Sequence, residues 1–557
     1  MSSDSEVEEA STHAATLKKL KFKDPDFYEF LKENDKELLE FKDSESEDDE
    51  QEAANDDEEE EVEDEPDIKI SAQKLAFIKE NIGEAPTFKL CKALIQAFKS
   101  AVNQADGSDK KIDMSNSEFF NDVIKLCLIE LVPALYKVMH ISAAPGKKKI
   151  DPTKSKVWKK VQMSVKSYLI DMLKMISLMK ESSVLVLLLK HTVHLIPFYN
   201  VFIKLSRHLL KKMVTLWSSE EETVRVLSLM IIVRSTKSLP KEYLGQVLKE
   251  MYFAYIKNTK FTSPTTWPMI NFMKRSLTEV YALNPEMAYE HGFIYIRQMS
   301  IHLRNAITTK KKEAFQTVYN WQYTHCILLW SHLLCRLVDH EPLKSLIYPL
   351  VQTTIGAINL IPTAKYIPLR FHLVKALMHI SKTTGIFIPV LPFILDVLKI
   401  VDFNKKSNFS VKPVEFSCAL KVTKSQLLEA GFKDSCISEV CCLLIDYLKI
   451  YASSIGFPEL ALPAVLQIKN FIKQCKVSKY NQQLKTVLVK IEENSLLISE
   501  KRRLVTFSIA DNDQVKRWEE NICSEGTPLL QMKTESKKES VVVVEDMPPK
   551  KKRKHKK

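Results

Sequence analysis

The chain has 557 residues, which is too many for one hydrophobic core and indicates either several domains or an array of repeats. Hydrophobic residues make up 45% of the sequence, and the net charge of +11 hides a strong segregation. Residues 43–67 hold seventeen acidic residues and no basic one, so the rest of the chain carries +28. Only three glycines lie between Gly146 and Gly385, which argues against the glycine-dependent loops of phosphate-binding enzymes and serine hydrolases.

The large positive charge outside residues 43–67 favours nucleic acid or another polyanion as a partner. The alternative is that lysine-rich helix faces are simply solvated, and charge alone favours neither. The ten cysteines form no C-x-x-C pair and the N-terminus lacks an apolar core of a secretory signal, so we expect reduced, mostly buried thiols in an intracellular protein. No cofactor is expected.

The N-terminal region predicts one isolated helix. Residues 1–19 have a disordered composition, and residues 20–42 read as an amphipathic docking helix that follows Asp24 and Pro25. Its apolar face consists of Phe27, Phe30, Leu31, Leu38 and Phe41. A lone helix of this length cannot bury its own face, so it docks either on the rest of the chain or on a partner. Residues 43–67 then predict an acidic disordered linker.

Residues 68–400 predict a HEAT-like helical array, and the fold class is all-α. Trp267, Ile270, Met273, Leu277 and Val280 illustrate the helical spacing of the apolar residues. Prolines are expected at helix starts, where a missing N–H costs no hydrogen bond. These prolines are Pro197, Pro240, Pro264, Pro285, Pro342, Pro368, Pro389 and Pro458. The interval from Pro240 to Pro285 holds one helix pair, within the range of HEAT-like repeats.

Two segments interrupt the helical pattern. Residues 141–160 form a connection with seven lysines, and residues 401–417 lose the helical period and read as extended. The second interruption begins a block, 401–523, in which an extended segment precedes further helices. The uncharged stretch Ser345–Ala364 contains prolines and polar residues, so a buried helix is expected there and no membrane span.

The tail, 524–557, has a disordered composition and ends in a dense basic run after Pro549. The run has the form of a nuclear localisation signal: Lys550, Lys551, Lys552, Arg553 and Lys554. The alternative is a nonspecific polyanion-binding tail, and both roles are compatible.

Catalytic and metal-binding patterns are weak. His325, His332 and Cys335 share one helix face with apolar residues, so core positions are favoured over a metal or nucleophile role. The same interpretation applies to His191 and His194. The sequence contains no H-E-x-x-H, Walker, dinucleotide-binding or nucleophile-elbow motif, so no catalytic or metal residue is predicted.

Clusters of basic residues, some with aromatic neighbours, are candidates for RNA binding, because cations on a helical surface can follow a phosphate backbone. The alternative is that they pair with acids on adjacent helices. The candidates are Lys147, Lys148, Lys149, Lys274, Arg275, Arg297, Arg304, Lys310, Lys311 and Lys312, the last three in a loop.

Several long segments, in order, resemble the nucleolar complex protein 2 family. They are FYEFLKENDKELLEF (27–41), WPMINFMKRSLTEVY (267–281), YEHGFIYIRQMSIHLRNA (289–306), VYNWQYTHCILLWSHLL (318–334), YIPLRFHLVKAL (366–377), GIFIPVLPFILDVL (385–398) and KRRLVTFSIADNDQVKRWE (501–519). The resemblance covers about 20–42 and 66–520. It implies a helical HEAT-like body in the nucleus, nucleolus and nucleoplasm, with a role in maturation and intranuclear transport of large-subunit precursors. It also implies a heterodimer with a sister nucleolar complex protein, the first or third of the series. A longer basic N-terminal extension, found in some relatives, is not present before Phe27.

We therefore expect a non-enzymatic assembly factor of the large ribosomal subunit, a scaffold that pairs with a sister protein and with pre-rRNA. The aromatic-rich region of about 260–500 is the expected partner surface, although most of its aromatics can instead fill the core. The alternative function is a chromatin co-regulator whose acidic run, 43–67, binds histones.

Overall fold

The computed structural model describes residues 72–84, 86–106, 117–141, 151–239, 241–407, 414–508 and 510–532. The chain divides into two compact units, 1–69 and 70–557, and every described residue belongs to the second. The predicted docking helix, the acidic linker and the part of the predicted tail beyond residue 532 therefore lie outside the described residues. The tail was expected to begin at residue 524, but residues 524–532 complete one helix and form a further short one, Pro528–Gln531, in which Leu529 is buried, so the prediction of disorder is wrong there. The described residues form α-helices, short 3₁₀ turns and connections without a strand, which confirms the all-α prediction for this part of the chain.

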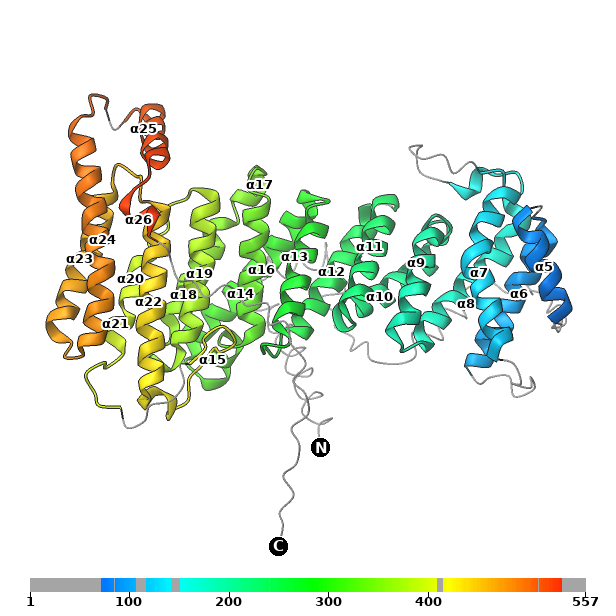
Figure 1. The fold of residues 1–557 in the computed structure, drawn as a ribbon, viewed down its shortest axis with the longest axis horizontal. Helices are drawn as coiled ribbons and strands as arrows, with labels where there is room; N and C mark the ends of the chain where they lie inside the picture. Colours follow the sequence, from blue (N-terminus) through cyan, green and yellow to red (C-terminus); the bar gives the residue numbers. More distant parts are fainter. Residues whose placement is uncertain are drawn as a thin grey trace, which may run out of the picture. The chain divides into compact units, whose positions relative to one another are not determined.

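Most helices of the first half follow one another with short connections, whereas the longer segments 106–116 and 139–157 separate the early ones (Figure 1). They are α5 (Ala72–Glu84), α6 (Phe88–Ala105), α7 (Ser117–Val138), η1 (Pro152–Lys154), α8 (Trp158–Leu178), α9 (Ser182–Tyr199), α10 (Ile203–Ser219), α11 (Glu222–Ser238) and α12 (Lys241–Asn258). Most contacts join helices close in sequence, such as α6 with α7 and α8, α9 with α11, and α10 with α11 and α12. Each helix thus buries its apolar face against near neighbours in the chain.

The second half continues in the same way. It comprises α13 (Trp267–Tyr281), α14 (Pro285–Thr309), α15 (Lys312–Val318), α16 (Trp321–Arg336), α17 (Glu341–Lys344), α18 (Ile347–Leu360), η2 (Ala364–Tyr366), α19 (Ile367–Thr384), α20 (Leu391–Leu395), α21 (Val397–Ile400), η3 (Gln426–Leu428), α22 (Ala430–Ile450), α23 (Phe457–Gln474), α24 (Ser478–Arg503), α25 (Asn512–Glu525) and α26 (Pro528–Gln531). Helix α16 packs along α19 and also contacts α13, and α14 packs along α18. The described parts of 401–417 form bends, turns and irregular backbone.

Buried aromatic residues fill much of the interior between these helices. Trp330, Tyr281 and Phe371 are at most 1% exposed, and the rings of Tyr252 and Tyr295 stack with centroids 3.9 Å apart. Burying one large apolar side chain stabilises the fold by about 2–3 kcal/mol. Much of the aromatic content of the 260–500 region is therefore used inside the molecule.

The expected positions of the prolines are only partly right. Pro285, Pro342, Pro368 and Pro458 lie in the first turns of α14, α17, α19 and α23, as predicted. Pro197 was expected at a helix start but lies inside α9. The helix ends two residues later at Tyr199, so the hydrogen bond that Pro197 lacks is lost only in the last turn.

Two further prolines were misplaced by the sequence pattern. Pro264 and Pro389 lie in the segments that precede α13 and α20, and the prolines in the first turns of those helices are Pro268 and Pro392. Where two prolines lie close together, the one nearer the helix occupies its first turn, and the other remains in the connection.

One described helix, α9, is long and apolar enough to cross a membrane. Its 18-residue window is 56% buried inside the fold. Because α9 packs against α7, α8, α10 and α11, it has the surroundings of a core helix. The uncharged stretch Ser345–Ala364 contains α18, which buries Leu350, Thr354 and Ile358.

Candidate nucleic-acid interface

Some of the predicted site residues lie outside the described residues. They are Phe27, Phe30, Leu31, Leu38 and Phe41 of the expected docking helix, Lys147, Lys148 and Lys149, and Lys550, Lys551, Lys552, Arg553 and Lys554 of the tail. Their proposed roles remain predictions. The remaining candidates belong to α13, α14 and the start of α15.

Helix α14 carries the longest row of candidate RNA-binding residues. Its N-terminus is fixed by Asn284, whose side-chain oxygen accepts the N–H groups of Glu286 and Met287 at 3.1 and 3.3 Å. Arg297 and Arg304 follow on one face at a spacing of seven residues, and Arg304 is exposed. Both arginines therefore sit on a long helix with a well-defined start.

Lys310, Lys311 and Lys312 continue this row, but only partly as a loop. Lys310 ends α14 in the left-handed conformation, with φ of 52°, and Lys312 is the first residue of α15. The predicted loop is therefore a two-residue junction between helices. All three lysines are exposed, and with Arg304 they form no ion pair within the described part of the chain. These four cations face solvent, as contacts to a phosphate backbone require.

Apolar side chains lie beside these cations on α14. Phe293 is 37% exposed and Ile307 is 50% exposed, and both share the face of Arg297 and Arg304 by their three- and four-residue spacing. We name this face, with Lys310, Lys311 and Lys312, the α14 face. It combines charge with exposed apolar surface, which suits a macromolecular ligand better than a small ion.

The other predicted pair, Lys274 and Arg275, lies on α13. Lys274 is half-buried and its ammonium donates to the side-chain oxygen of Asn271 at 3.1 Å, whereas Arg275 is exposed and forms no ion pair within the described residues. The ring of Phe272, on the same helix, lies 5.8 Å from the guanidinium of Arg225.

The histidines predicted to be core residues on α16 divide into two environments. His325 is 1% exposed, and its Nε2 lies 2.9 Å from the hydroxyl of Thr262. Burial, with a smaller contribution from Lys274, lowers the pKa of His325 to about 3, so the ring is neutral. His332 is only half-buried and lies beside His379 of α19, with ring centroids 5.9 Å apart.

Nucleophilic chemistry is disfavoured at Cys335. Its thiol is 6% exposed and donates weakly to the carbonyl of His379 at 3.7 Å. Burial raises the pKa of Cys335 to about 11, which keeps the sulfur protonated and weakly nucleophilic. Among the described residues, no group of three or more His, Cys, Asp or Glu side chains is placed to hold a metal ion.

His194 was predicted to share the core role of His191, and this prediction is wrong. His191 is 4% exposed, whereas His194 faces solvent together with Leu187 and Lys190 on the other side of α9. Residues three apart on a helix differ by about 60° around the axis, and here the edge of the buried face falls between them.

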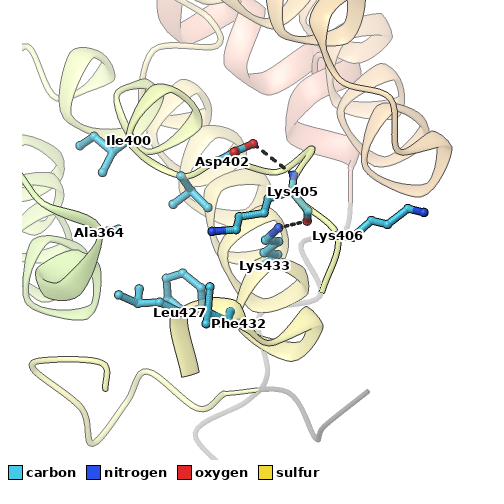
Figure 2. A pocket seen from close by; sticks show the side chains of 10 residues that line it. Ala364, Ile400, Asp402, Lys405, Lys406, Leu427, Phe432 and Lys433 are labelled. Carbon is cyan, nitrogen blue, oxygen red and sulfur yellow. Dashed lines mark hydrogen bonds between the residues drawn. The ribbon is translucent and has the colours of Figure 1, made fainter. Parts of the chain in front are cut away.

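A small pocket lies between the 401–407 segment and the start of α22 (Figure 2). Its volume is about 100 Å³, and Ile400, Leu427 and Phe432 contribute apolar walls. Lys433 is 4% exposed and donates to the carbonyl of Lys405 at 2.5 Å, while the side chain of Lys406 points away from the pocket. The buried ammonium thus secures the 401–407 segment, which gives Lys433 a structural role.

Sequence reasoning missed His379 and Lys382, which lie beside the predicted residues on α13 and α16. The available signal was the seven-residue spacing of His372 and His379 on α19, which repeats the spacing of His325 and His332 on α16. Pairing these two rows requires knowledge that α16 packs along α19, and one sequence does not contain it.

The described part is an all-helical protein with solvent-facing cations on α13, α14 and α19. Its sequence is similar to those of known proteins. The Noc2p family model matches residues 242–535, which is more than half of the chain. The chain is 39% identical to nucleolar complex protein 2 of Drosophila melanogaster over 93% of its own length and 74% of the relative's. It is 32% identical to a NOC2 family protein of Schizosaccharomyces pombe, covering 95% of this chain and 76% of that one. It is also 30% identical to nucleolar complex-associated protein 2 of Arabidopsis thaliana, covering 92% and 70%. The chain belongs to the Noc2p family.

Proposed function

We propose that this chain is a non-enzymatic assembly factor of the large ribosomal subunit, acting in the nucleolus and nucleoplasm. Family membership carries the proposal, because the relatives from Drosophila melanogaster and Arabidopsis thaliana are named as nucleolar complex proteins. The scarcity of glycine between 146 and 385 and the protonated thiol of Cys335 agree with a binding role. The protein then acts by binding alone: its helical surface holds the partners together until they are released.

The partners we propose are a sister nucleolar complex protein, the first or third of its series, and pre-rRNA in precursors of the large subunit. Helices that pack mainly on near neighbours support a HEAT-like array over 68–400, followed by the 401–523 block. Such an array offers extended surfaces on which a protein and an RNA can bind side by side. The α14 face is the proposed RNA surface, because Arg304 and Lys310–Lys312 are exposed and form no ion pair within the described residues.

The segments outside the described residues have proposed roles that rest on sequence alone. The helix of 20–42 docks through Phe27, Phe30, Leu31, Leu38 and Phe41, either on a partner or on the chain itself. The basic run from Lys550 to Lys554 directs nuclear import. The acidic run of 43–67 binds basic ribosomal proteins or, in the alternative function, histones.

A tagged pull-down from nuclear extract at moderate salt tests the proposal, with proteins identified and bound RNA sequenced. The assembly factor recovers large-subunit precursor rRNA together with one sister protein, and the sister's identity defines the heterodimer. Recovery of histones and transcription regulators without precursor rRNA contradicts the proposal. Deleting 43–67 separates the two functions further, because a co-regulator loses histone binding whereas an assembly factor stays on the precursor.

A further inference from the structure

Five basic or titratable side chains from three helices lie close enough to act on one another at one place on the surface. They are Lys274 and Arg275 of α13, His332 of α16, and His379 and Lys382 of α19, which we name the histidine cluster. Helix α16 packs against both α13 and α19, so the three helices form a continuous surface here. Arg275, His379 and Lys382 are exposed, and Lys274 and His332 are half-buried.

The two imidazoles lie at the centre of the histidine cluster. The rings of His332 and His379 are 5.9 Å apart between centroids and inclined by 22°, close to parallel. The weak hydrogen bond from Cys335 to the carbonyl of His379 joins the helices at this level. The rings are thus held side by side by packed helices, with His332 half-buried and His379 exposed.

The surroundings of the two rings are positively charged. Burial and then Lys274 are the largest causes that lower the pKa of His332, to about 4, and His379 and Arg275 add to them. Burial, Lys274 and Lys382 lower the pKa of His379. Both rings are therefore neutral near pH 7, because protonation would add charge beside cations.

Among the described residues, Glu279 is the acidic group that acts on His332. Glu279 of α13 raises the pKa of His332, but its carboxylate already accepts from Nε of Arg336 at 3.0 Å. Lys375 of α19 pairs with Glu439 of α22 at 2.6 Å. His325 and His372 lie deeper along the same helices and are neutral through burial. The cluster is therefore a place where an anion relieves repulsion.

We propose that the histidine cluster binds phosphate groups of single-stranded RNA, and that His332 and His379 take up protons when the phosphate binds. Two imidazoles, two ammonium groups and a guanidinium offer several N–H donors to one tetrahedral anion. The inference rests on the proposed function for its ligand, since that function supplies RNA.

The aromatic residues at one end of α16 favour RNA over an acidic peptide. Trp321 and Trp267 are half-buried and pack against His325, with ring centroids 5.3 and 5.9 Å from it. Trp321 lies eleven positions before His332, roughly 16 Å along the helix. A strand lying along α16 meets aromatic edges first and the cations next, the combination that single-stranded RNA sites use.

The sign of the pH dependence follows from linkage. The free rings have lowered pKa values and are neutral near pH 7, and a bound phosphate raises those values. Binding therefore takes up protons, so the affinity rises as the pH falls below neutrality. A site made only of lysine and arginine would show no such dependence, because their charge is constant over this range.

Fluorescence anisotropy with the purified full chain and a labelled single-stranded RNA homopolymer tests the inference at constant salt. We expect roughly tenfold tighter binding at about pH 6 than at about pH 8. The double variant His332→Gln with His379→Gln should lose most of that gain. His208→Gln, an exposed histidine on α10, should retain it. Circular dichroism at both pH values verifies that each variant is folded.

Two results would overturn the inference. One is a pH dependence that the double variant keeps in full. The other is equal competition by polyglutamate, which would identify a general acidic-peptide surface. Each is distinct from failure of the proposed function, because the pull-down can recover precursor rRNA while the purified double variant binds RNA as the wild type does. As a second measurement, Arg275→Gln should lower the slope of log affinity against log salt by about 1, which corresponds to one counterion fewer released.

Discussion

The hydroxyl of Tyr168 on α8 and Nε2 of His191 on α9 lie 2.8 Å apart in the interior. The other ring nitrogen, Nδ1, lies 2.9 Å from the carbonyl of Leu128 on α7. Since a carbonyl only accepts, Nδ1 carries the proton and donates, and Nε2 accepts from the tyrosine hydroxyl. One neutral imidazole therefore joins three successive helices, in a single defined tautomer.

Replacing Tyr168 by Phe should destabilise the fold by about 1–3 kcal/mol, because Nε2 of a histidine that is 4% exposed is left without a donor. Urea unfolding monitored by circular dichroism measures this loss. Tyr199→Phe is a matched control: its hydroxyl is equally buried but donates to the carbonyl of Leu169 inside α8. That carbonyl retains a helical partner, so the control should cost less. A Tyr168 variant as stable as the wild type would refute this account.

Acid should destabilise the protein between about pH 6.5 and pH 4 because of three buried histidines. Burial is the main cause that lowers the pKa of His191 and His372 to about 4 and that of His325 to about 3. At low pH the histidines bind protons in the unfolded chain but not in the folded chain. The free energy of unfolding that is present above about pH 6.5 is therefore lost as the pH falls. Each group contributes up to about 3 kcal/mol.

Asp171 opposes this trend, since burial raises its pKa to about 6 and its folded form gains stability below that value. His332 and His379, whose pKa values are also lowered, add to the three buried histidines, and Glu250, whose pKa burial raises, adds to Asp171. The histidines outnumber the carboxyls, so the urea midpoint should fall as the pH is lowered from about 7.5 to about 5. His191→Asn should flatten the profile while lowering stability at neutral pH. An unchanged midpoint across this range would show that the histidines titrate normally in the folded protein.

The helices themselves were largely predictable because their signal is local. The apolar spacing that begins at Trp267 gave α13, and Ile270, Met273, Leu277 and Val280 are all at most 1% exposed. The junction at Lys310 was read as a loop, because the left-handed residue that ends α14 is a lysine and the usual glycine signal is missing. Proline positions carry a weaker signal, since a proline near a helix end costs little free energy on either side of that end.

The candidate site was predicted only in part, because its geometry depends on contacts between distant residues. Lys274 and Arg275 were selected from their charge, but His379 lies more than a hundred residues further on and joins them only through the packing of α13, α16 and α19. His332 was read as a core residue since it shares a face with Leu328. The structure leaves its ring half-exposed at the rim of that face.

Gly292 lies where α14 packs closely against its neighbours. A Cβ at this position would lie 2.9 Å from Cδ1 of Leu346 and 3.3 Å from the ring of Trp330, which is fully buried. Gly292→Ala should therefore destabilise the fold by about 1–3 kcal/mol, although alanine is the better helix former. Thermal unfolding measures this change.

Gly83 provides the matched control for Gly292. It also lies within a helix, α5, but a Cβ there would meet no atom within 4 Å. Gly83→Ala should stabilise the protein by about 0.5–1 kcal/mol through helix propensity alone. The two substitutions are chemically identical, so changes of opposite sign in the free energy of unfolding isolate the effect of packing. Stabilisation by both would mean that Leu346 moves aside at no cost.

The α14 face should determine much of the salt dependence of RNA binding. Arg304→Gln and Lys311→Gln each remove an exposed cation that forms no ion pair within the described residues, so each should lower the slope of log affinity against log salt by about 1. Lys344→Gln is the control, because that ammonium already pairs with Glu341 at 2.6 Å on α17.

The measurement is the fluorescence anisotropy of a labelled single-stranded RNA over a salt series. Neither position is a histidine, so the loss should be the same at about pH 6 and about pH 8, unlike that at His332 and His379. Slopes that match the wild type would place the RNA on another surface.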